Sequence, residues 1–307
     1  MKNIITSLNK AEYFFRPAQL VKRLLKRSAK TDEKNVIAIL PWGHEINVSP
    51  SEDIGKAIMT LGLYDLTVSE VIHRLCRMNP AEEKVVLDVG ANIGYMTSVL
   101  SQSLSQKDKV ISFEPHPAVF NKLKKNAASW NNGAKIELEN LALSNESGFI
   151  NLMIPSNFKD NEGLGFLATA LTEEKTKDAV VCKKVKTMAL DEYWNSSTYR
   201  DKNIFLMKID TEGNELLVLQ GAKNFLAQKR VQHILFEEHE LYPAASMLFL
   251  EKMGYTIYFL KRGFLSPRLI PVKETTKETW EPNNFLATLS SEVIEKNLSA
   301  WGWKILH

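Results

Sequence analysis

The sequence lacks several features that would place it in a specialised class of protein. Its only two cysteines, Cys76 and Cys182, lie far apart in no metal-ligand spacing, which excludes a disulfide-rich secreted scaffold. Lysine and arginine (39) nearly balance aspartate and glutamate (36), so no global positive field indicates nucleic-acid binding. No apolar run approaches the roughly 18 residues of a membrane span, and the amino terminus does not resemble a signal peptide. We therefore expect a cytoplasmic protein without a nucleic-acid partner.

The chain has enough apolar sequence to build a large core, since 44% of its 307 residues are hydrophobic. From Val85 onwards, strand-like and helical patterns alternate, which favours a parallel-rich sheet covered by helices on both faces. The candidate strands are Val85–Val89, Lys109–Glu114, Lys135–Asn140, Ile204–Ile209, His233–Glu237, Thr256–Leu260 and Phe285–Leu289. These patterns predict an α/β, Rossmann-like fold with seven strands in its sheet.

Three regions are expected along the chain. Residues 1–80 form a helical accessory region, residues 81–290 the main domain, and residues 291–307 a carboxyl-terminal tail. Within the main domain, residues 147–186 interrupt the alternation with two β-like runs around a polar segment. Connections of this length are commonly lids over functional sites. We therefore expect this insertion to cover the substrate.

The most informative segment reads VVLDVGANIG and is followed by a second strand-like segment, VISFEP, that contains Glu114. A strand leading into a glycine-bearing turn, then a strand ending in a carboxylate, is typical of α/β proteins that bind an adenosine-type ligand. The dinucleotide pattern GxGxxG is incomplete, because only Gly90 and Gly94 remain, with Asn92 between them. Asp88 would also repel a pyrophosphate. A cationic ligand without phosphate, S-adenosylmethionine, fits better, with Glu114 accepting hydrogen bonds from its ribose.

These segments resemble the FkbM-type methyltransferases, a family of class I S-adenosylmethionine-dependent enzymes. The matching segments cover about residues 60 to 290 and read DVGANIGY, FEPHP, TMALDEYW, MKIDTEGNELLVLQGA, ILFEEH, MGYTIY and NNFLA. The resemblance implies S-adenosylmethionine as the cofactor. The expected cofactor-binding residues are Asp88, Gly90, Ala91, Asn92, Gly94, Tyr95, Glu114, Pro115 and Asp210.

Acidic residues recur at the carboxyl ends of the candidate strands, where open α/β sheets bind their ligands. Asp88, Glu114, Asp210 and Glu237 are therefore expected on one rim. Methylation of a hydroxyl needs a general base, because a neutral alcohol is a poor nucleophile. The candidate catalytic residues are Asp210, Glu212, Glu238 and His239.

The same carboxylates raise the alternative of a bound magnesium or manganese ion, because both prefer oxygen ligands. Their spacing matches no dedicated metal motif, and acids at strand ends also bind donor and acceptor directly. We therefore expect no metal.

The resemblance implies methyl transfer to a hydroxyl oxygen of a sugar, glycolipid or secondary-metabolite acceptor. Three alternatives stay open at this point. N-methylation is the nearest. A nicotinamide-linked oxidoreductase is weakened by the missing third glycine and by Asp88. A non-catalytic module that binds an adenosyl ligand is disfavoured because Asp88, Gly90, Gly94, Glu114 and Asp210 are all present.

The amino-terminal region carries a basic amphipathic pattern. Its basic residues are Arg16, Lys22, Arg23, Lys26, Arg27, Lys30 and Lys34, interleaved with Leu20, Val21, Leu24 and Leu25 at helical spacing. Such a helix can lie on an anionic membrane surface as a peripheral contact, or pack its leucines on the domain as a solvated accessory helix. It could also mediate a homodimer, as could exposed strand edges.

Overall fold

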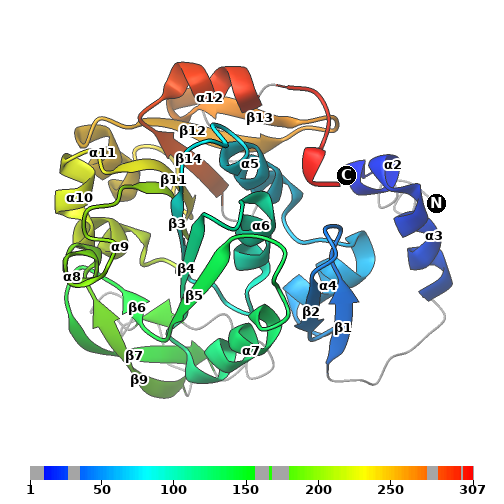
Figure 1. Ribbon diagram of the computed structural model, residues 1–307, viewed down its shortest axis with the longest axis horizontal. Coiled ribbons are helices and arrows are strands. Elements are labelled where there is room, and N and C mark those ends of the chain that lie inside the picture. The colour runs from blue at the N-terminus through cyan, green and yellow to red at the C-terminus, as the bar shows by residue number, and fades with distance from the viewer. Residues whose placement is uncertain are drawn as a thin grey trace.

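The computed structural model of the protein describes residues 10–26, 35–155, 166–167, 180–274, 283–298 and 300–306. At its centre lies a mixed eight-stranded sheet flanked by helices (Figure 1). In order across the sheet, the strands are β13 (Pro267–Pro271), β12 (Thr256–Arg262), β14 (Asn283–Thr288), β11 (Val231–Glu238), β10 (Ile204–Ile209), β3 (Val85–Val89), β4 (Lys109–Phe113) and β5 (Lys135–Glu139). The predicted strands are all present, and the sequence did not predict the edge strand β13.

The order of the strands creates a ligand-binding edge. Strands β5, β4, β3, β10 and β11 run parallel, and β14 runs antiparallel between β11 and β12. The chain begins this sheet at β3, adds β4 and β5 on one side, and then returns to add β10 and β11 on the other. At such a reversal, a crevice opens at the carboxyl ends of the strands. The prediction of a Rossmann-like α/β fold is confirmed.

The sheet has a hydrophobic core on each face, which explains the continuous apolar sequences of its central strands. Neighbouring residues of β3 point into different cores: Val86 into one and Leu87 into the other. The first core includes residues of α5 (Leu66–Cys76), α6 (Tyr95–Ser103), α7 (Pro117–Ala127) and α12 (Ser291–Leu298). The second includes residues of α8 (Leu190–Ser196), α9 (Glu215–Gly221), α10 (Lys223–Ala227) and α11 (Ala245–Lys252).

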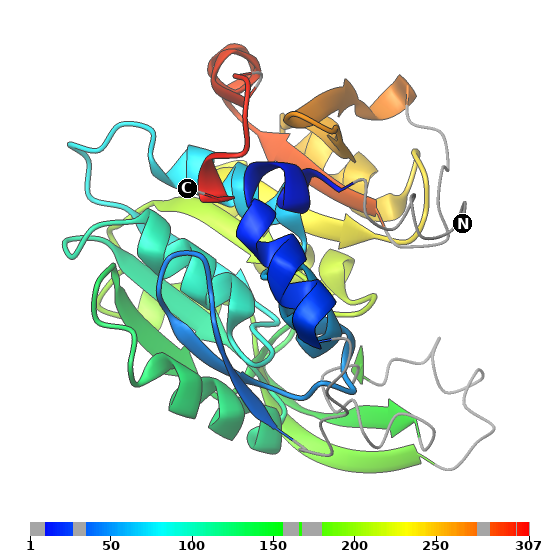
Figure 2. The same ribbon diagram turned by 90° about the vertical axis from the view of Figure 1, so that its right-hand side faces the viewer.

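The amino-terminal elements stand beside the main sheet (Figure 2). They are α2 (Ala11–Phe15), α3 (Pro17–Lys26), the antiparallel pair β1 (Val36–Ile39) and β2 (Glu45–Val48), and α4 (Asp53–Leu61). Pro17 explains the break between α2 and α3, because proline favours the first position of a helix. The Tyr13 hydroxyl and the Gln19 amide both donate to the Thr60 carbonyl at the end of α4. The predicted basic helix is thus described as far as Lys26, and residues 27–34 lie outside the described part.

The predicted insertion forms most of a second, smaller sheet, and β6 lies just before the insertion. The strands of this sheet are β6 (Ala142–Leu143), β9 (Val180–Met188), β7 (Gly148–Pro155) and β8 (Phe166–Leu167). Strands β7 and β9 pair antiparallel along their length, from Gly148 opposite Thr187 to Pro155 opposite Val180. Most of the polar segment between them lies outside the described residues. The role of this insertion as a substrate cover therefore stays a prediction.

A buried ion pair anchors the carboxyl-terminal segment to α5. Glu70 and Arg74 lie 2.6 Å apart (Oε1 to Nε), and Glu70 also accepts hydrogen bonds from the backbone N–H groups of Lys304 and Ile305. The Arg74 guanidinium donates to four backbone carbonyls between residues 297 and 302. The predicted tail is thus packed against the domain. Within the described residues, no helix is both long and apolar enough to span a membrane.

Candidate active site

A cavity of about 970 Å³ lies at the carboxyl ends of the parallel strands, where the sheet order predicts a ligand. This volume is at the upper end of the range typical of small-molecule sites. Of the predicted site residues, those that line it are Gly90, Ala91, Asn92, Tyr95, Glu114, Pro115, Asp210 and Glu212. Asp88, Gly94, Glu238 and His239 do not.

The turn after β3 requires its glycines for close packing rather than for a pyrophosphate. Gly90 has a φ of +79°, and a Cβ there would lie 1.8 Å from the carbonyl oxygen of Asp210. Gly94 has a φ of +97° and starts α6, and a Cβ there would lie 2.5 Å from Leu123. Asn92 between them also has a positive φ, +51°. The turn therefore brings its own backbone to the cavity wall.

Glu114 occupies the position expected of a ribose acceptor. Its carboxylate accepts hydrogen bonds from the backbone N–H groups of Asn92 (2.9 Å) and His116 (2.8 Å), one on each oxygen. Burial raises the pKa of Glu114 to about 7, although these two hydrogen bonds oppose the shift. Each carboxylate oxygen has a second lone pair, so Glu114 can still accept from two neighbouring hydroxyls. The residue fits the ribose of an adenosyl ligand.

Asp88, by contrast, lies beneath the cavity and not on its wall. It is fully buried, and its carboxylate accepts a hydrogen bond from the Thr97 hydroxyl of α6 (2.6 Å). Its other oxygen lies 3.6 Å from Nζ of Lys208. Side chains alternate along a strand, and Asp88 points toward α6 instead of the cavity. The expected direct contact of Asp88 with the ligand is not what the structure shows.

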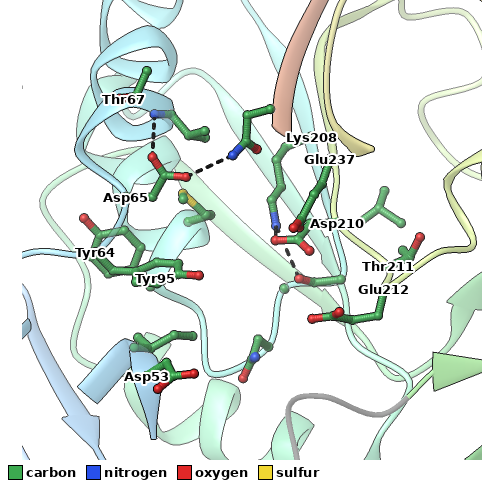
Figure 3. Close-up of a pocket in the computed structure, with 18 of the residues that line it drawn as sticks. Asp53, Tyr64, Asp65, Thr67, Tyr95, Lys208, Asp210, Thr211, Glu212 and Glu237 are labelled. Carbon is green, nitrogen blue, oxygen red and sulfur yellow. Dashed lines mark hydrogen bonds and ion pairs between the residues drawn. The ribbon is translucent and has the colours of Figure 1, made fainter. Parts of the chain in front are cut away.

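Lys208 on β10 contacts both the buried Asp88 and Asp210 on the cavity wall. Its Nζ lies 3.0 Å from Asp210 (Figure 3) and 3.5 Å from the carbonyl of Gly90. It also lies 3.6 Å from Asp88. Burial alone would lower the pKa of Lys208, but the charges of Asp210 and Asp88 outweigh it and raise the pKa. The lysine therefore stays charged inside the site.

Asp210, Glu212 and Glu237 form a carboxylate cluster at the ends of β10 and β11 (Figure 3). Burial alone would raise the pKa of Asp210, but Lys208 and a hydrogen bond from Glu237 lower it. Burial and the charge of Asp210 raise the pKa of Glu237 to about 10. Burial and Asp210 also raise the pKa of Glu212, to about 7. At neutral pH, the cluster therefore holds an ionised Asp210, a protonated Glu237 and a Glu212 that titrates.

Glu212 sits in a backbone conformation that its neighbours impose. Its φ is +54°, which is unfavourable for a residue with a side chain. The buried carboxylate of Glu215 holds this loop by accepting hydrogen bonds from Thr211 and from the backbone N–H of Gly213. Strained backbone of this kind is maintained mostly at functional sites.

Two predicted catalytic residues lie elsewhere. Glu238 accepts hydrogen bonds from the Ser246 hydroxyl of α11 and from the backbone N–H of Glu240. His239 is exposed beyond the end of the strand. Neither side chain lines the cavity. β11 extends through Glu238, so Glu237 and Glu238 point to opposite sides of the strand. His239 still lies close enough for its charge to lower the pKa of Asp210. Glu237 is the residue that reaches the cavity.

The opposite wall contains residues that sequence reasoning missed. Asp65, with a φ of +37°, accepts hydrogen bonds from the backbone N–H of Val68 and from the amide of Asn284 (3.0 and 3.3 Å). Tyr64 lies beside it (Figure 3), and Arg262 lines the same cavity. The Arg262 guanidinium also donates to the buried carboxylate of Glu12 on α2 (2.5 Å). The motif NNFLA contains Asn284, and was the one available signal for this wall.

Among the residues that the structure describes, no group of three or more histidine, cysteine, aspartate or glutamate side chains is arranged to hold a metal ion. The carboxylate cluster is instead neutralised in part by Lys208 and by the proton on Glu237.

The strand order, the glycine turn without pyrophosphate spacing, and a carboxylate at the ribose position together define a class I S-adenosylmethionine-dependent methyltransferase. The model of the FkbM methyltransferase domain matches residues 88–257, more than half of the chain. The protein therefore belongs to the FkbM methyltransferase family, and S-adenosylmethionine is its methyl donor. This assignment leaves no place for the nicotinamide alternative.

Two curated methyltransferases are similar in sequence. Hexuronic acid methyltransferase AglP of Haloferax volcanii is 30% identical over 57% of this chain and 64% of its own length. Methyltransferase sdnD of Sordaria araneosa is 26% identical over 58% of this chain and 71% of its own. The chain thus spans less than two thirds of AglP.

Solved methyltransferase structures are similar at a low level. An S-adenosylmethionine-dependent O-methyltransferase from Thermotoga maritima has a TM-score of 0.41 at 14% identity, over 79% of this chain and 72% of its own. An S-adenosylmethionine-dependent methyltransferase from Agrobacterium tumefaciens has a TM-score of 0.43 at 7% identity, over 84% of this chain and 70% of its own.

Proposed function

We propose that this methyltransferase transfers the methyl group to a hydroxyl oxygen of a sugar-containing acceptor. The observation that carries the proposal is the position of Glu212, a largely buried carboxylate that lines the cavity beside Asp210. A hydroxyl must lose its proton as it attacks, so a base has to lie within reach of the acceptor.

The wall formed by the turn after β3 and the end of β4 would hold the donor. Glu114 would accept hydrogen bonds from the ribose hydroxyls, and the backbone from Gly90 to Asn92 would line the same wall. Bound there, S-adenosylmethionine supplies an electrophilic methyl group on a positively charged sulfur. Asp210, ionised because Lys208 stabilises its charge, is placed to attract the cationic part of the ligand. Asp88 acts indirectly, by positioning Lys208.

Glu212 is the general base in this proposal. General-base catalysis is most efficient when the pKa of the base lies near the working pH, and the pKa of Glu212 is raised to about 7. The pKa of Asp210 is lowered, which makes it a weaker base, and Glu237 holds its own proton at neutral pH. Glu238 and His239 lie outside the cavity. The proton therefore passes from the acceptor hydroxyl to a Glu212 oxygen.

The opposite wall suits a polyhydroxylated acceptor. Asp65, Asn283 and Asn284 place carboxylate and amide groups on it, and these groups both accept from and donate to sugar hydroxyls. Arg262, whose guanidinium is paired with Glu12, has further N–H donors that could contact the carboxylate of an acidic sugar. The name of the relative AglP, a hexuronic acid methyltransferase, supports testing acidic sugars first.

The test has two stages. Titration calorimetry with S-adenosylhomocysteine and, separately, with NADH should give binding of the first alone. Turnover with methyl-labelled S-adenosylmethionine is then measured on a panel of neutral hexosides, hexuronides and amino sugars, and the methylated atom is located by NMR. An O-methyl ether on a sugar supports the proposal, and an N-methyl product overturns it.

A methyl ester on a hexuronide would overturn the hydroxyl acceptor and the need for a base, and would keep only the sugar-containing acceptor. A carboxylate acceptor is already ionised and needs no base. In that case, the Glu212→Gln variant should keep nearly full kcat, which separates ester formation from ether formation. Binding of S-adenosylhomocysteine without turnover on any acceptor would favour the non-catalytic alternative.

A further inference from the structure

We propose that an exposed aromatic patch beside the cavity docks the enzyme on an anionic membrane surface. The patch consists of Phe14, Phe15, Phe264, Leu265 and Trp301. Phe14 and Trp301 are 63% and 65% exposed, and Phe264 and Leu265 are 45% and 39% exposed. Aromatic side chains at this exposure are typical of the interface between lipid head groups and acyl chains.

Three distant segments of the chain build this patch. The ring centroids of Phe14 and Phe264 are 5.6 Å apart, and those of Phe15 and Trp301 are 6.1 Å apart. The carboxyl-terminal segment lies beside α2 in both views (Figures 1 and 2). The patch is therefore one continuous surface and not a set of isolated apolar residues.

Two hydrogen bonds to backbone carbonyls hold the patch in place. The indole N–H of Trp303 donates to the carbonyl of Phe264 (2.9 Å), and the N–H of Gly302 donates to the carbonyl of Leu265 (3.1 Å). These bonds fix the turn between β12 and β13 to the carboxyl-terminal segment. Exposed aromatic rings on a fixed backbone lose little entropy when they insert into an interface.

Basic residues adjoin the patch, which favours an anionic membrane as its partner. Helix α3 begins two residues after Phe15, and its sequence contains three basic residues (Lys22, Arg23 and Lys26) and no acidic one. Lys304 and Arg268 are exposed on the other two segments. Each basic residue near an anionic lipid surface adds about 1 kcal/mol to binding.

The patch also adjoins the opening of the cavity. Lys10 and Arg262 both line the cavity, and they lie four residues before Phe14 and two residues before Phe264. The ion pair between Glu12 and Arg262 joins the two segments. Docking would bring the cavity close to the head groups, where a sugar carried on a lipid could enter. That consequence rests on the proposed function, whereas membrane binding does not.

Vesicle co-sedimentation of the full chain tests the proposal. The vesicles contain phosphatidylcholine alone or with 30% phosphatidylglycerol, as a stated test composition. The patch variant is Phe14→Ser with Trp301→Ser. The matched control is Phe149→Ser, because Phe149 is 68% exposed on β7, in the separate small sheet. Thermal unfolding and S-adenosylhomocysteine binding confirm that each variant is folded. If the double variant does not fold, Phe264→Ser replaces it.

The expected result is binding of the wild type to the anionic vesicles only, weakened about tenfold or more in the patch variant and less than twofold in the control. Equal binding of patch and control variants, or no binding of the wild type, would overturn the proposal.

Sedimentation velocity adds a further outcome. A wild-type dimer that the patch substitutions dissociate, without vesicle binding, would assign the patch to a second copy of the chain. Activity on water-soluble acceptors should be unchanged in every variant, so these outcomes are independent of the proposed reaction.

Discussion

The two walls of the cavity differ in how their residues are distributed along the chain. The wall that we assign to the donor comes from two neighbouring strand ends, with Gly90, Asn92 and Glu114. The opposite wall takes single residues from remote places, with Asp65 before α5 and Asn284 on β14. A wall built from contiguous segments leaves a motif in the sequence, and a wall assembled by the fold does not. The class of donor is therefore readable from the sequence, and the acceptor is not.

The carboxylate cluster stands between the two walls, and its removal should have the largest effect on activity. Replacing Glu212 by glutamine keeps its size but removes the base, so we expect kcat to fall by about 10²- to 10⁴-fold for a hydroxyl acceptor. In the wild type, kcat should rise with pH through about 7, because the base acts only when ionised. The variant should lack this rise. Initial rates are measured at saturating donor, so that the titration of Glu114, which affects donor binding, does not change the measured rate.

Glu238→Gln is the matched control for that variant. It is a neighbouring carboxylate of the same type, but it faces Ser246 of α11 and not the cavity. We expect its kcat to stay within about twofold of the wild type, in line with surface substitutions in general. A loss of activity in Glu238→Gln comparable to that in Glu212→Gln would contradict the assignment of the base.

The donor wall should tolerate no side chain at its tightest point. In Gly90→Ala, the added Cβ would lie 1.8 Å from a backbone carbonyl oxygen, which cannot move without shifting β10. We expect the free energy of unfolding to fall by about 3 kcal/mol or more, and binding of S-adenosylhomocysteine to be lost.

Gly213→Ala is the control, because Gly213 also has a positive φ (+96°) but no atom within 4 Å of the added Cβ. It should cost only about 1 to 2 kcal/mol. Denaturant unfolding of both variants measures the difference, and equal losses would show that conformation alone, not close packing, selects glycine at Gly90.

Much of the donor wall could be predicted because strand periodicity and a glycine turn are local properties. The same reasoning placed Glu238 and His239 in the site. β11 continues through Glu238, so this side chain points to the opposite side of the strand from Glu237, and His239 follows the end of the strand. The same reasoning also placed Asp88 on the wall, although the strand turns that side chain toward α6. Pairing of β12 with β14 brings Arg262 and Asn284 to one cavity, and no local pattern predicts that pairing.

The functional difference between the walls can be tested by a pair of substitutions. Glu114→Gln removes the charged acceptor of the ribose, so we expect the Kd for S-adenosylhomocysteine to rise about tenfold or more at pH 8.5, where Glu114 is ionised. Near pH 5.5 the difference in Kd between wild type and variant should narrow, because wild-type Glu114 is then protonated.

Asn284→Ala removes the amide that holds Asp65, so we expect the KM for the acceptor to rise about fivefold with the donor Kd unchanged. If either variant alters both constants equally, the two walls do not have separate ligands.

The remaining expected effect concerns the stability of the carboxylate cluster itself. The pKa of Glu237 is raised in the folded protein, from 4.5 to about 10, by burial and by Asp210. The folded state therefore holds a proton that the unfolded state releases above pH 4.5, and stability falls as pH rises from there toward 10. The slope of the unfolding free energy against pH from this group is at most about 1.4 kcal/mol per pH unit.

Glutamine at position 237 can donate to Asp210 as the protonated acid does, so Glu237→Gln should keep the stability of the wild type near pH 5. Between pH 7 and 8, denaturant unfolding should show a shallower decline in the variant. Parallel declines would place the shared proton elsewhere in the cluster, and Glu212 and Glu114 would be the next carboxyls to replace.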